Sequence, residues 1–428
     1  MNRAVAELYA PDIITLATKP DTPRIPFKHE VFEEAVEWLH KEGRYTADML
    51  ADPHAHRLIE ETYNALNGAI DSSITQEMPE EMTYALRNNA FIFSGFKTHR
   101  TLSEVGLELT DEEGNLKPYA KFLEDVKRID SKYNDTYLYA EYNHAVHTTQ
   151  MAVKWQDFVR DGDDYNLQYR TAGDERVREA HIALDGVTLP PSDKFWDRYL
   201  PPNGWNCRCT VVQVLREDFP LSDSEEAIKR GDENTQSIKQ QMFRFNPGKT
   251  LEVFPPKHPY LPKGCGDCQL RLNLAWGKGQ EQCSACNCTR RYLLKFSRTN
   301  ALNRLNEEHR PPVKIRGEQV QYRRLYYGKN DRENVIQHCN NPQEVLIALR
   351  LEEFLPTMQP RGEEPLKEKK NTQKKIDRGV KCYTKYEFEA DILERGQLVK
   401  RAFILKCEVI KTKKSAKCEY PYCIQPKE

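Results

Sequence analysis

The chain has 428 residues, with 64 Lys and Arg against 65 Asp and Glu, so its formal net charge at pH 7 is −1. Charged residues make up 30% of the sequence, and no stretch approaches the roughly 20 apolar residues that a membrane-spanning helix needs. The composition therefore argues against a membrane span and gives no global electrostatic reason for binding nucleic acid. The length predicts two or three domains.

Four prolines punctuate the first 26 residues, which we expect to form an extended arm. A disordered tail and an arm that docks on a partner both fit this pattern. The first residues carry acids and no long apolar run, so we expect no secretory signal. The twelve cysteines then indicate thiols and metal ligands in a reducing cytosol rather than a disulfide framework.

From Phe27 to about Gln156 the pattern is helical, with apolar residues at intervals of three and four. Asp52 followed by Pro53 predicts the start of one helix. Residues 131–157 predict a single long helix whose packing face carries Tyr139, Tyr142, Val146 and Thr149. His144 and His147 are spaced to ligate a metal, but we expect ordinary polar helix residues, because no further ligand is identified for them.

After Gly162 the period changes. Residues 165–171 and 209–214 predict strands, and residues 174–183 predict a short helix between them. Residues 217–241 predict a charged surface helix or a linker, and Asn246-Pro-Gly248 predicts a domain boundary.

Residues 174–209 combine acids, arginines, a histidine and two cysteines with aromatic, Pro and Gly residues, a mixture that fits a compact site closing the chain on itself. The stretch contains R-x-x-H-x-x-L-D-G and then P-P-x-G-W-x-C-R-C, and it resembles the core of the phage Mu F-like minor head, or head morphogenesis, proteins. The residues that carry the resemblance are Asp174, Arg178, His181, Asp185, Gly186, Trp196, Pro201, Pro202, Trp205, Cys207, Arg208 and Cys209.

The resemblance implies a metal site in many relatives, built from a Cys-x-x-Cys before L-D-G and a His before Cys-x-Cys. This chain has His181 and Trp205 near those positions, which leaves His181, Cys207 and Cys209 as ligands. We favour a metal-free polar cluster over a zinc site. In this cluster His181 and Asp185 form hydrogen bonds with backbone groups. Arg176, Arg178 and Arg208 form ion pairs with Asp174 and Asp185. A nucleophilic cysteine with His181 as base is a weaker alternative.

The strongest metal signal in the sequence lies further on. Cys265 and Cys268, then Cys283 and Cys286, have spacing close to that of a zinc ribbon, and Cys288 is an alternative ligand. Four thiolates would close the coordination sphere, so the predicted zinc is structural. Reduced, unligated thiols are the alternative reading.

The last domain, about residues 313–428, is predicted to contain a helix at 343–354, a Lys- and Pro-rich loop at 358–381 and strands at 381–389 and 399–411. The basic run fits a solvated loop better than a nucleic-acid contact. Head-protein relatives often end in variable extensions, some similar to RNA nucleases, and His338, Glu344, Lys381 and Arg401 are weak candidates for such chemistry.

The sequence thus predicts an α+β protein. An extended arm (1–26) precedes a mainly helical Mu F-like domain (27–246) closing on a small β-containing core, a Cys-rich zinc module (255–296) and a C-terminal α+β domain (313–428). The resemblance implies a minor capsid protein of a tailed phage or prophage, which binds the portal and other capsid or scaffold proteins inside the procapsid, in the host bacterial cytoplasm during assembly. The alternative is a phage-carried nuclease-like effector that acts on RNA.

Overall fold

The structure is a computed structural model of the whole chain, and it describes residues 25–255, 257–261, 283–307, 315–317, 320–325, 335–366, 372–394, 396–410 and 418–427. The chain divides into two compact units, Met1–Arg290 and Arg291–Glu428. Helices and sheets occur together, as the predicted α+β class requires. In the described parts, no helix is long and apolar enough to cross a membrane.

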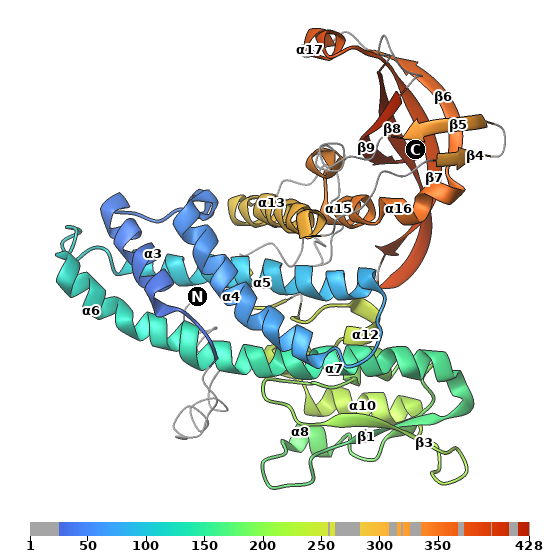
Figure 1. Cartoon of the computed structure of the whole chain (residues 1–428). Coiled ribbons are helices and arrows are strands. Elements are labelled where there is room, and N and C mark those ends of the chain that lie inside the picture. Colours follow the sequence, from blue (N-terminus) through green and yellow to red (C-terminus); the bar gives the residue numbers. More distant parts are fainter. Residues whose placement is uncertain are drawn as a thin grey trace. The chain divides into compact units, whose positions relative to one another are not determined.

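The first unit begins with a layer of long helices, as the apolar spacing predicts. Asp52 caps one of them, because its carboxylate accepts a hydrogen bond from the backbone N–H of His54 at 2.9 Å. The predicted helix at 131–157 is part of a longer one: α6, η2 and α7 run without a break from Tyr119 to Asp161 (Figure 1). The helical elements are α3 (His29–Glu42), η1 (Ala47–Ala51), α4 (Pro53–Ser73), α5 (Glu80–Leu107), α6 (Tyr119–Asp130), the π-helical η2 (Ser131–Tyr137) and α7 (Leu138–Asp161).

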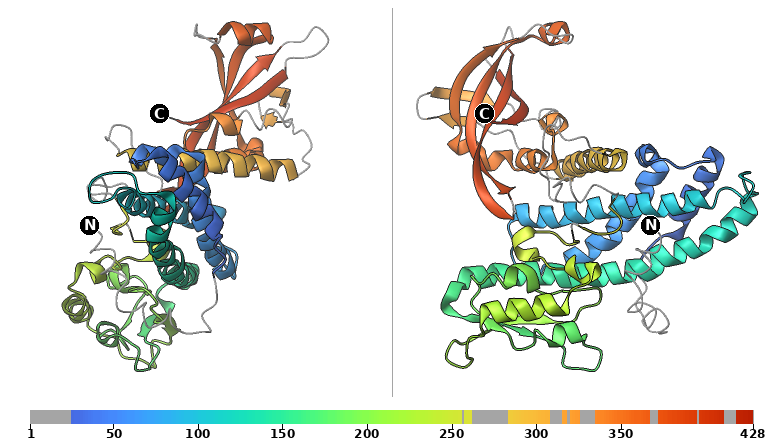
Figure 2. Two further views of the ribbon diagram at one scale, coloured as in Figure 1. Left: turned by 90° about the vertical axis from the view of Figure 1, so that its left-hand side faces the viewer. Right: turned by 180° about the vertical axis from the view of Figure 1, so that it is seen from behind.

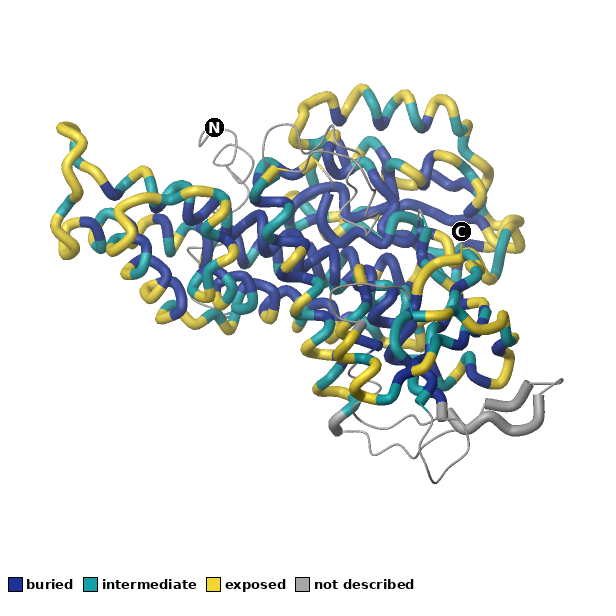
Figure 3. The backbone as a smooth tube through the Cα atoms, turned by 90° about the horizontal axis from the view of Figure 1, so that it is seen from above, coloured by how far each residue is buried: buried dark blue, intermediate teal, exposed yellow. Residues whose placement is uncertain are grey.

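The packing face of α7 differs from the predicted one. Tyr139, Tyr142 and Val146 are only half-buried, whereas the buried stripe includes Glu141 and His144. Helix α5 is buried on nearly every side through its middle, and Lys97 lies in that buried part. Figure 3 shows such buried stretches in dark blue, with exposed turns in yellow. A polar helix face is therefore sealed inside this unit, which periodicity of apolar residues could not indicate.

A small antiparallel sheet, ordered β2-β1-β3, follows the helices. Strands β1 (Asn166–Arg170) and β3 (Thr210–Val214) match the predicted strands, and β2 (Thr188–Leu189) adds an edge. The predicted helix at 174–183 is wrong over its first half: α8 spans only Glu179–Ile182, and residues 174–177 form turns, because Asp174 is held by Arg208 instead of starting a helix.

The core of this region joins the end of α7 to the sheet. It contains Met151, Trp155, Phe158, Leu167, Tyr169, Leu184, Val187, Leu189, Phe195, Trp196, Tyr199, Leu200, Val211 and Ala227. Helices α9 (Trp196–Tyr199), α10 (Ser224–Asn234) and α11 (Ile238–Gln241) surround it, so the charged stretch after residue 217 is largely helical.

Residues around the predicted boundary at Asn246–Gly248 pack inside the first unit. They form α12 (Pro247–Thr250), and a Cβ atom on Gly248 would lie 2.2 Å from Trp155 Cβ. Only glycine allows this approach, so the Pro-Gly pair marks close helix packing here rather than a linker.

The second unit contains a six-stranded sheet ordered β4-β5-β9-β8-β7-β6, in which β5 and β9 are parallel and the other pairs antiparallel. Its long strands, orange and red in Figure 2, form a strongly curved layer. The strands are β4 (Ile315–Gly317), β5 (Val320–Leu325), β6 (Gln359–Pro365), β7 (Val380–Glu394), β8 (Gln397–Ile410) and β9 (Cys418–Pro426).

Helices pack against the apolar face of this sheet. They are the later part of α13 (Ser284–Glu307, which crosses the division between the units), α15 (Pro342–Leu349) and α16 (Leu351–Phe354), followed by η4 (Leu355–Thr357). The helix expected at 343–354 is thus present with a break at Arg350. The loop expected at 358–381 is wrong in part, because β6 pairs with β7 and residues 372–377 form helix α17 (Thr372–Asp377).

Candidate metal centre

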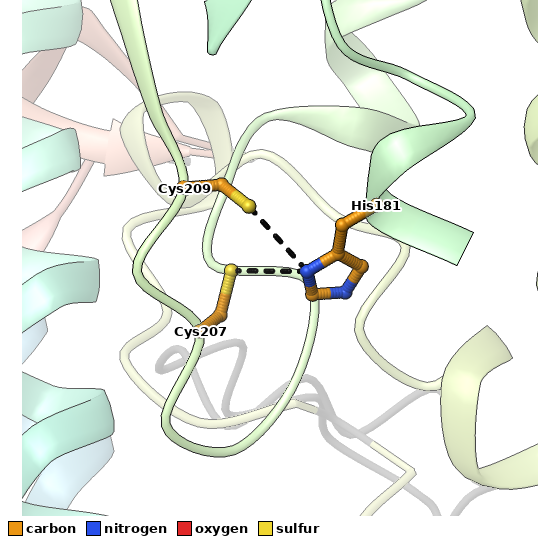
Figure 4. A group of neighbouring side chains, drawn as sticks. All are labelled: His181, Cys207 and Cys209. Carbon is orange, nitrogen blue, oxygen red and sulfur yellow. Dashed lines mark hydrogen bonds between the residues drawn. The ribbon is translucent and has the colours of Figure 1, made fainter. Parts of the chain in front are cut away.

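His181, Cys207 and Cys209 meet although up to 28 residues separate them (Figure 4). His181 lies on α8, and both cysteines lie just before β3. Gly186, at φ +77°, turns the chain from α8 toward β2. Asn206, at φ +53°, turns it directly before Cys207, and Asn is among the residues that tolerate this region.

The spacing of the three side chains suits a metal ion. His181 Nδ1 lies 3.6 Å from Cys207 Sγ and 3.4 Å from Cys209 Sγ. In a tetrahedral zinc site with bonds of about 2.0 Å to nitrogen and about 2.3 Å to sulfur, nitrogen and sulfur ligands lie about 3.5 Å apart. His181, Cys207 and Cys209 each offer one ligand atom, and these three atoms lie within 4.8 Å of one another. Among the described residues, no other group of three His, Cys, Asp or Glu residues meets this criterion. The donor set and its spacing fit zinc.

The electrostatics of the two sulfurs favour one thiolate. The pKa of Cys207 is lowered well below its usual value by a hydrogen bond from Cys209 and, against the opposing effect of burial, by His181. The pKa of Cys209 is raised by its bond to Cys207 and by burial. A thiolate is the form of cysteine that binds metals, so the lowered pKa of Cys207 favours the form that could act as a ligand.

The surroundings of His181 differ from the favoured interpretation in one respect. Its ring nitrogen lies beside two sulfurs rather than at backbone, and whether this cluster holds a metal stays a prediction. Asp185 does bond to backbone, accepting from Thr171 N at 2.7 Å. The alternative of a nucleophilic cysteine has the required thiolate and imidazole, but Cys207 is buried, with 2% of its surface exposed. Burial restricts the access of a substrate to Cys207, while Cys209 is half-buried and has a raised pKa.

Arginines near the cluster join the segment that carries His181 to the loop that carries the two cysteines. Arg208 forms two hydrogen bonds of 2.6 Å with Asp174, and Arg176 lies 3.4 Å from the same carboxylate. The bond to Arg208 holds the pKa of Asp174 well below its usual range. Arg178 donates to the carbonyl oxygen of Trp205 at 2.6 Å, tying the helix of His181 to the cysteine loop. The predicted Asp174 pairs with Arg176 and Arg208 are thus present, while Arg178 contacts the backbone of Trp205.

Tyr169 of β1 forms a buried wall of the site. It is fully buried, donates a hydrogen bond to Asn203 Oδ1 at 2.9 Å, and lies in hydrogen-bonding reach of Cys209. Burial raises the pKa of the Tyr169 hydroxyl. The sequence did not single out Tyr169 as a residue of the site. Its position in the predicted strand at 165–171 is the only feature of the sequence that pointed to its burial.

The aromatic residues Phe195, Trp196 and Trp205, in and beside the loop at 190–204, are buried, but they face two ways. Phe195 and Trp196 belong to the core that contains the sheet, and Trp196 Nε1 donates to Pro190 O at 3.1 Å. Trp205 instead packs edge to face on His144 of α7 and on Phe243, with ring centroids 4.9 and 5.2 Å apart. The motif therefore joins the sheet to the helical layer. Its Pro201-Pro202 bond is cis.

His144 is part of this interior rather than an ordinary polar helix residue. Its side chain is 1% exposed, and burial lowers its pKa to about 3. A neutral imidazole surrounded by rings has a packing role, so the expectation that the His144 and His147 pair is no metal site stays compatible with the geometry.

The predicted zinc module lies mostly outside the described residues, including Cys265 and Cys268. Of its other cysteines, Cys283 precedes α13, and its sulfur accepts a hydrogen bond from Cys286 N at 3.4 Å. Cys286 is buried and Cys288 is half-buried. Cys283 and Cys286 thus lie on one turn at the start of α13, and a zinc site with four cysteines stays a prediction.

The four candidates for RNA chemistry in the second unit do not form one group. Glu344 is buried in the first turn of α15, whose N-cap is Asn341, and it accepts hydrogen bonds from Asn340 N and Asn341 Nδ2. Arg401 pairs with Glu394 at the far end of the β7–β8 hairpin, and Lys381 is exposed on β7. His338 lies against Tyr422, with ring centroids 4.2 Å apart. These positions assign Glu344 a structural role.

Comparison with known proteins supports the resemblance read from the motif. Residues 112–212 match the family described as Phage Mu protein F like protein. Protein F of Escherichia phage Mu, which carries the name of a capsid assembly protein, is 26% identical over 169 residues, or 38% of this chain and 35% of that protein. The Mu-like prophage FluMu F protein of Haemophilus influenzae is 41% identical over 44 residues, 10% of this chain and 11% of that protein.

The predicted similarity to the Mu F-like family is therefore confirmed over the segment from α6 to β3, which holds the candidate metal centre. The matches span about a third or less of the length of these relatives. No solved structure matches the chain.

Proposed function

We propose that this protein is a head morphogenesis protein of a tailed phage or prophage, which binds the portal and the inner procapsid during head assembly. The observation that carries the proposal is the family match over residues 112–212. That segment contains both the cluster of His181, Cys207 and Cys209 and the buried aromatic residues that pack around it. A compact unit with packed motif residues, one of whose sulfurs is sealed from substrate, suits a structural protein better than an enzyme.

Zinc at His181, Cys207 and Cys209 would serve this function by stabilising the fold. The bound ion would lock α8 to the loop before β3, and it would satisfy the buried thiolate of Cys207. A second structural zinc at Cys265, Cys268, Cys283 and Cys286 remains part of the proposal. With this assignment we place the protein in the procapsid interior or virion, after synthesis in the host bacterial cytoplasm.

The direct test is purification of procapsids from cells that make this protein together with the portal and shell proteins of its phage. We expect it to co-sediment with procapsids and to be lost from particles assembled without the portal. Its absence from procapsids that contain portal would contradict the proposal.

Metal content separates the two zinc sites. Elemental analysis of the purified full chain should find zinc that the pair Cys207→Ser and Cys209→Ser reduces by one equivalent. The pair Cys265→Ser and Cys268→Ser should remove the other. Cys382→Ser, a half-buried cysteine of β7, is the matched control and should leave the zinc content unchanged. Protein without zinc whose thiols all titrate freely would exclude both sites.

RNA cleavage by the second unit is the rival function. His338 lies against Tyr422, whereas Glu344 bonds to Asn340 and Asn341 and Arg401 pairs with Glu394, so we favour a non-catalytic role for this unit. The rival requires the full chain to cleave RNA and His338→Ala to abolish the cleavage. Intact RNA after incubation with the wild-type chain would leave the head-protein proposal as the better account.

A further inference from the structure

The basic segment before β7 is folded onto the sheet of the second unit. Between residues 372 and 385 the chain has five cations, Lys374, Lys375, Arg378, Lys381 and Lys385, and one acid, Asp377. Part of this segment forms α17, which contacts β7. Its cations therefore have defined positions, which the solvated loop expected from sequence would not give them.

Lys375 fastens α17 to the sheet. Its ammonium group lies 3.9 Å from the ring centre of Tyr422 on β9, 5.0 Å from that of Tyr383 on β7, and 3.4 Å from the carboxylate of Glu408 on β8. Its side chain is only 19% exposed, whereas Glu408 is almost fully buried. The lysine thus joins three strands, and it is held too firmly to be the main contact for a ligand.

Three rings from separate elements meet beside this lysine. The ring centroids of Tyr383 and Tyr422 are 5.6 Å apart and those of His338 and Tyr422 are 4.2 Å apart, with the ring planes of each pair tilted. All three residues are half-buried, so each keeps part of its surface exposed to solvent. The chain thereby builds a platform of His338, Tyr422 and Tyr383, which we call the aromatic platform.

Cations at the rim of the aromatic platform point into solvent. Arg378 lies 2.8 Å from Glu408, yet 58% of its side chain is exposed, and Lys374 is exposed on α17. The carboxylate of Glu408 offsets one of the neighbouring charges, and Asp377 is exposed nearby. On β6, Glu364 lies opposite Tyr383 and pairs with Lys385 and Lys406. The balance around the platform stays positive, because the cations Lys374, Lys375, Arg378, Lys381, Lys385 and Lys406 outnumber the acids Glu364, Asp377 and Glu408.

We propose that the aromatic platform and its basic rim bind single-stranded nucleic acid. Exposed cations contact phosphates, while unpaired bases stack on aromatic rings, and this combination is how sequence-tolerant single-strand binders work. Arg378 and Lys374 would hold phosphates, and Tyr422 with its neighbours would take a base. Duplex DNA offers no free base faces, so it lacks the second half of the interaction. The inference is independent of the proposed head function.

The test uses the full chain and fluorescein-labelled oligouridine and oligothymidine of about a dozen nucleotides, followed by fluorescence anisotropy. We expect saturable binding of either strand, weakening as salt increases. A duplex of the same length should bind at least about tenfold more weakly, because stacking contributes about 1–3 kcal/mol per base. Absence of binding at low salt, or duplex binding as tight as single-strand binding, would overturn the proposal.

Two pairs of variants locate the site. Lys374→Glu should weaken binding about fivefold or more and flatten the salt dependence. Lys400→Glu is the control, because it reverses the same charge at an exposed position near the far end of the β7–β8 hairpin. It should leave the affinity and the salt dependence unchanged. Tyr422→Leu should lose about tenfold in affinity, since it removes one stacking face. Tyr165→Leu, an exposed tyrosine of the first unit, is its control.

Tyr422→Phe keeps the ring and separates binding from folding. It should bind like the wild type if stacking matters. Equal losses in Lys374→Glu and Lys400→Glu would show a diffuse charge effect and refute the site. Unchanged binding in a folded Tyr422→Leu variant would refute it as well.

Discussion

Each unit buries a carboxylate beside cations, but the two clusters differ in how far they are sealed. In the first unit Glu141 accepts a hydrogen bond from Lys97 at 2.5 Å and another from Tyr260 at 2.8 Å, and the side chains of the ion pair are at most 1% exposed. In the second unit Glu408 contacts Lys375 and Arg378, whose side chains are 19% and 58% exposed.

The difference indicates two uses of the same chemistry. A fully desolvated pair is strongly coupled and cannot exchange its partners for a ligand, so Lys97 and Glu141 fix the position of α5 against α7 and of Tyr260 against both. Burial lowers the pKa of Lys97, although Glu141 opposes this effect. The cluster at Glu408 keeps one cation in water, where a ligand can reach it.

The largest effect should come from breaking the sealed cluster. Glu141→Gln leaves the Lys97 ammonium buried beside a neutral group, and we expect it to lower the free energy of unfolding by about 3–5 kcal/mol. All five tryptophans lie before residue 291, so urea unfolding followed by tryptophan fluorescence reports on the first unit alone.

The double variant Lys97→Met with Glu141→Leu is the control for that change. It replaces both charges by apolar groups of similar size, and it should recover more than half of the loss. A single variant as stable as the wild type would show that the pair is not sealed in solution.

Trp205→Ala should be nearly as damaging. Trp205 joins the cysteine loop to His144 within the same unit, and removing a buried tryptophan costs about 3–5 kcal/mol through lost contacts and the cavity left behind. Thermal unfolding by tryptophan fluorescence measures the change, and Trp38→Phe, outside the core motif, serves as the spectroscopic reference. Unchanged thermal stability of Trp205→Ala would contradict the packing role.

Acid should weaken the sealed interior next. Burial lowers the pKa of His99 to about 4, with a smaller contribution from Arg100, and that of His144 to about 3. Both values lie below the unfolded value near 6.5, so on acidification the unfolded chain takes up protons first. The stability that these groups contribute is present above about pH 6.5 and is lost progressively below it, by up to about 2 kcal/mol for each group at pH 5.

Urea unfolding at pH 7 and at pH 5 measures this loss. His99→Gln should show a smaller difference between the two conditions, whereas His54→Gln, a half-exposed histidine on α4, should keep the wild-type difference. Equal behaviour of the two variants would argue against a neutral, half-buried His99.

Breaking the partly open cluster should cost less. Glu408→Gln keeps the size of the side chain and removes its charge, so we expect a loss of about 1–2 kcal/mol, because Arg378 regains water when its partner is gone. Hydrogen exchange of peptides from residues 372–394 is the measurement, and it should accelerate around α17. A loss as large as that of Glu141→Gln would erase the distinction between the two clusters.

The smallest effect is expected at the tip of the β7–β8 hairpin. Arg401 and Glu394 form an ion pair with side chains 52% and 40% exposed, and water competes with such pairs. Arg401→Gln should therefore leave the unfolding of the second unit unchanged, as hydrogen exchange of residues 397–410 would show. Faster exchange in residues 397–410 would show that this exposed ion pair contributes more to the stability of the hairpin than expected for a pair in water.

The sequence by itself determined the local elements and the family resemblance. Alternation in residues 165–171 and a β-branched run in residues 209–214 predicted two strands, and Asp52-Pro53 predicted a helix start. These signals work because backbone geometry and capping act over a few residues. The motif from Asp174 to Cys209 indicated the matched family before any geometry was known.

Only the tertiary structure decided which side chains meet. His181 lies 26 and 28 residues from its two cysteines, Lys97 lies 44 residues from Glu141, and Tyr260 lies 119 residues from the same carboxylate. Whether such polar groups end in water, in a sealed pair or around a metal depends on the path of the chain between them. No local pattern encodes that path, because burial changes the energy of a charge only once distant segments have packed around it.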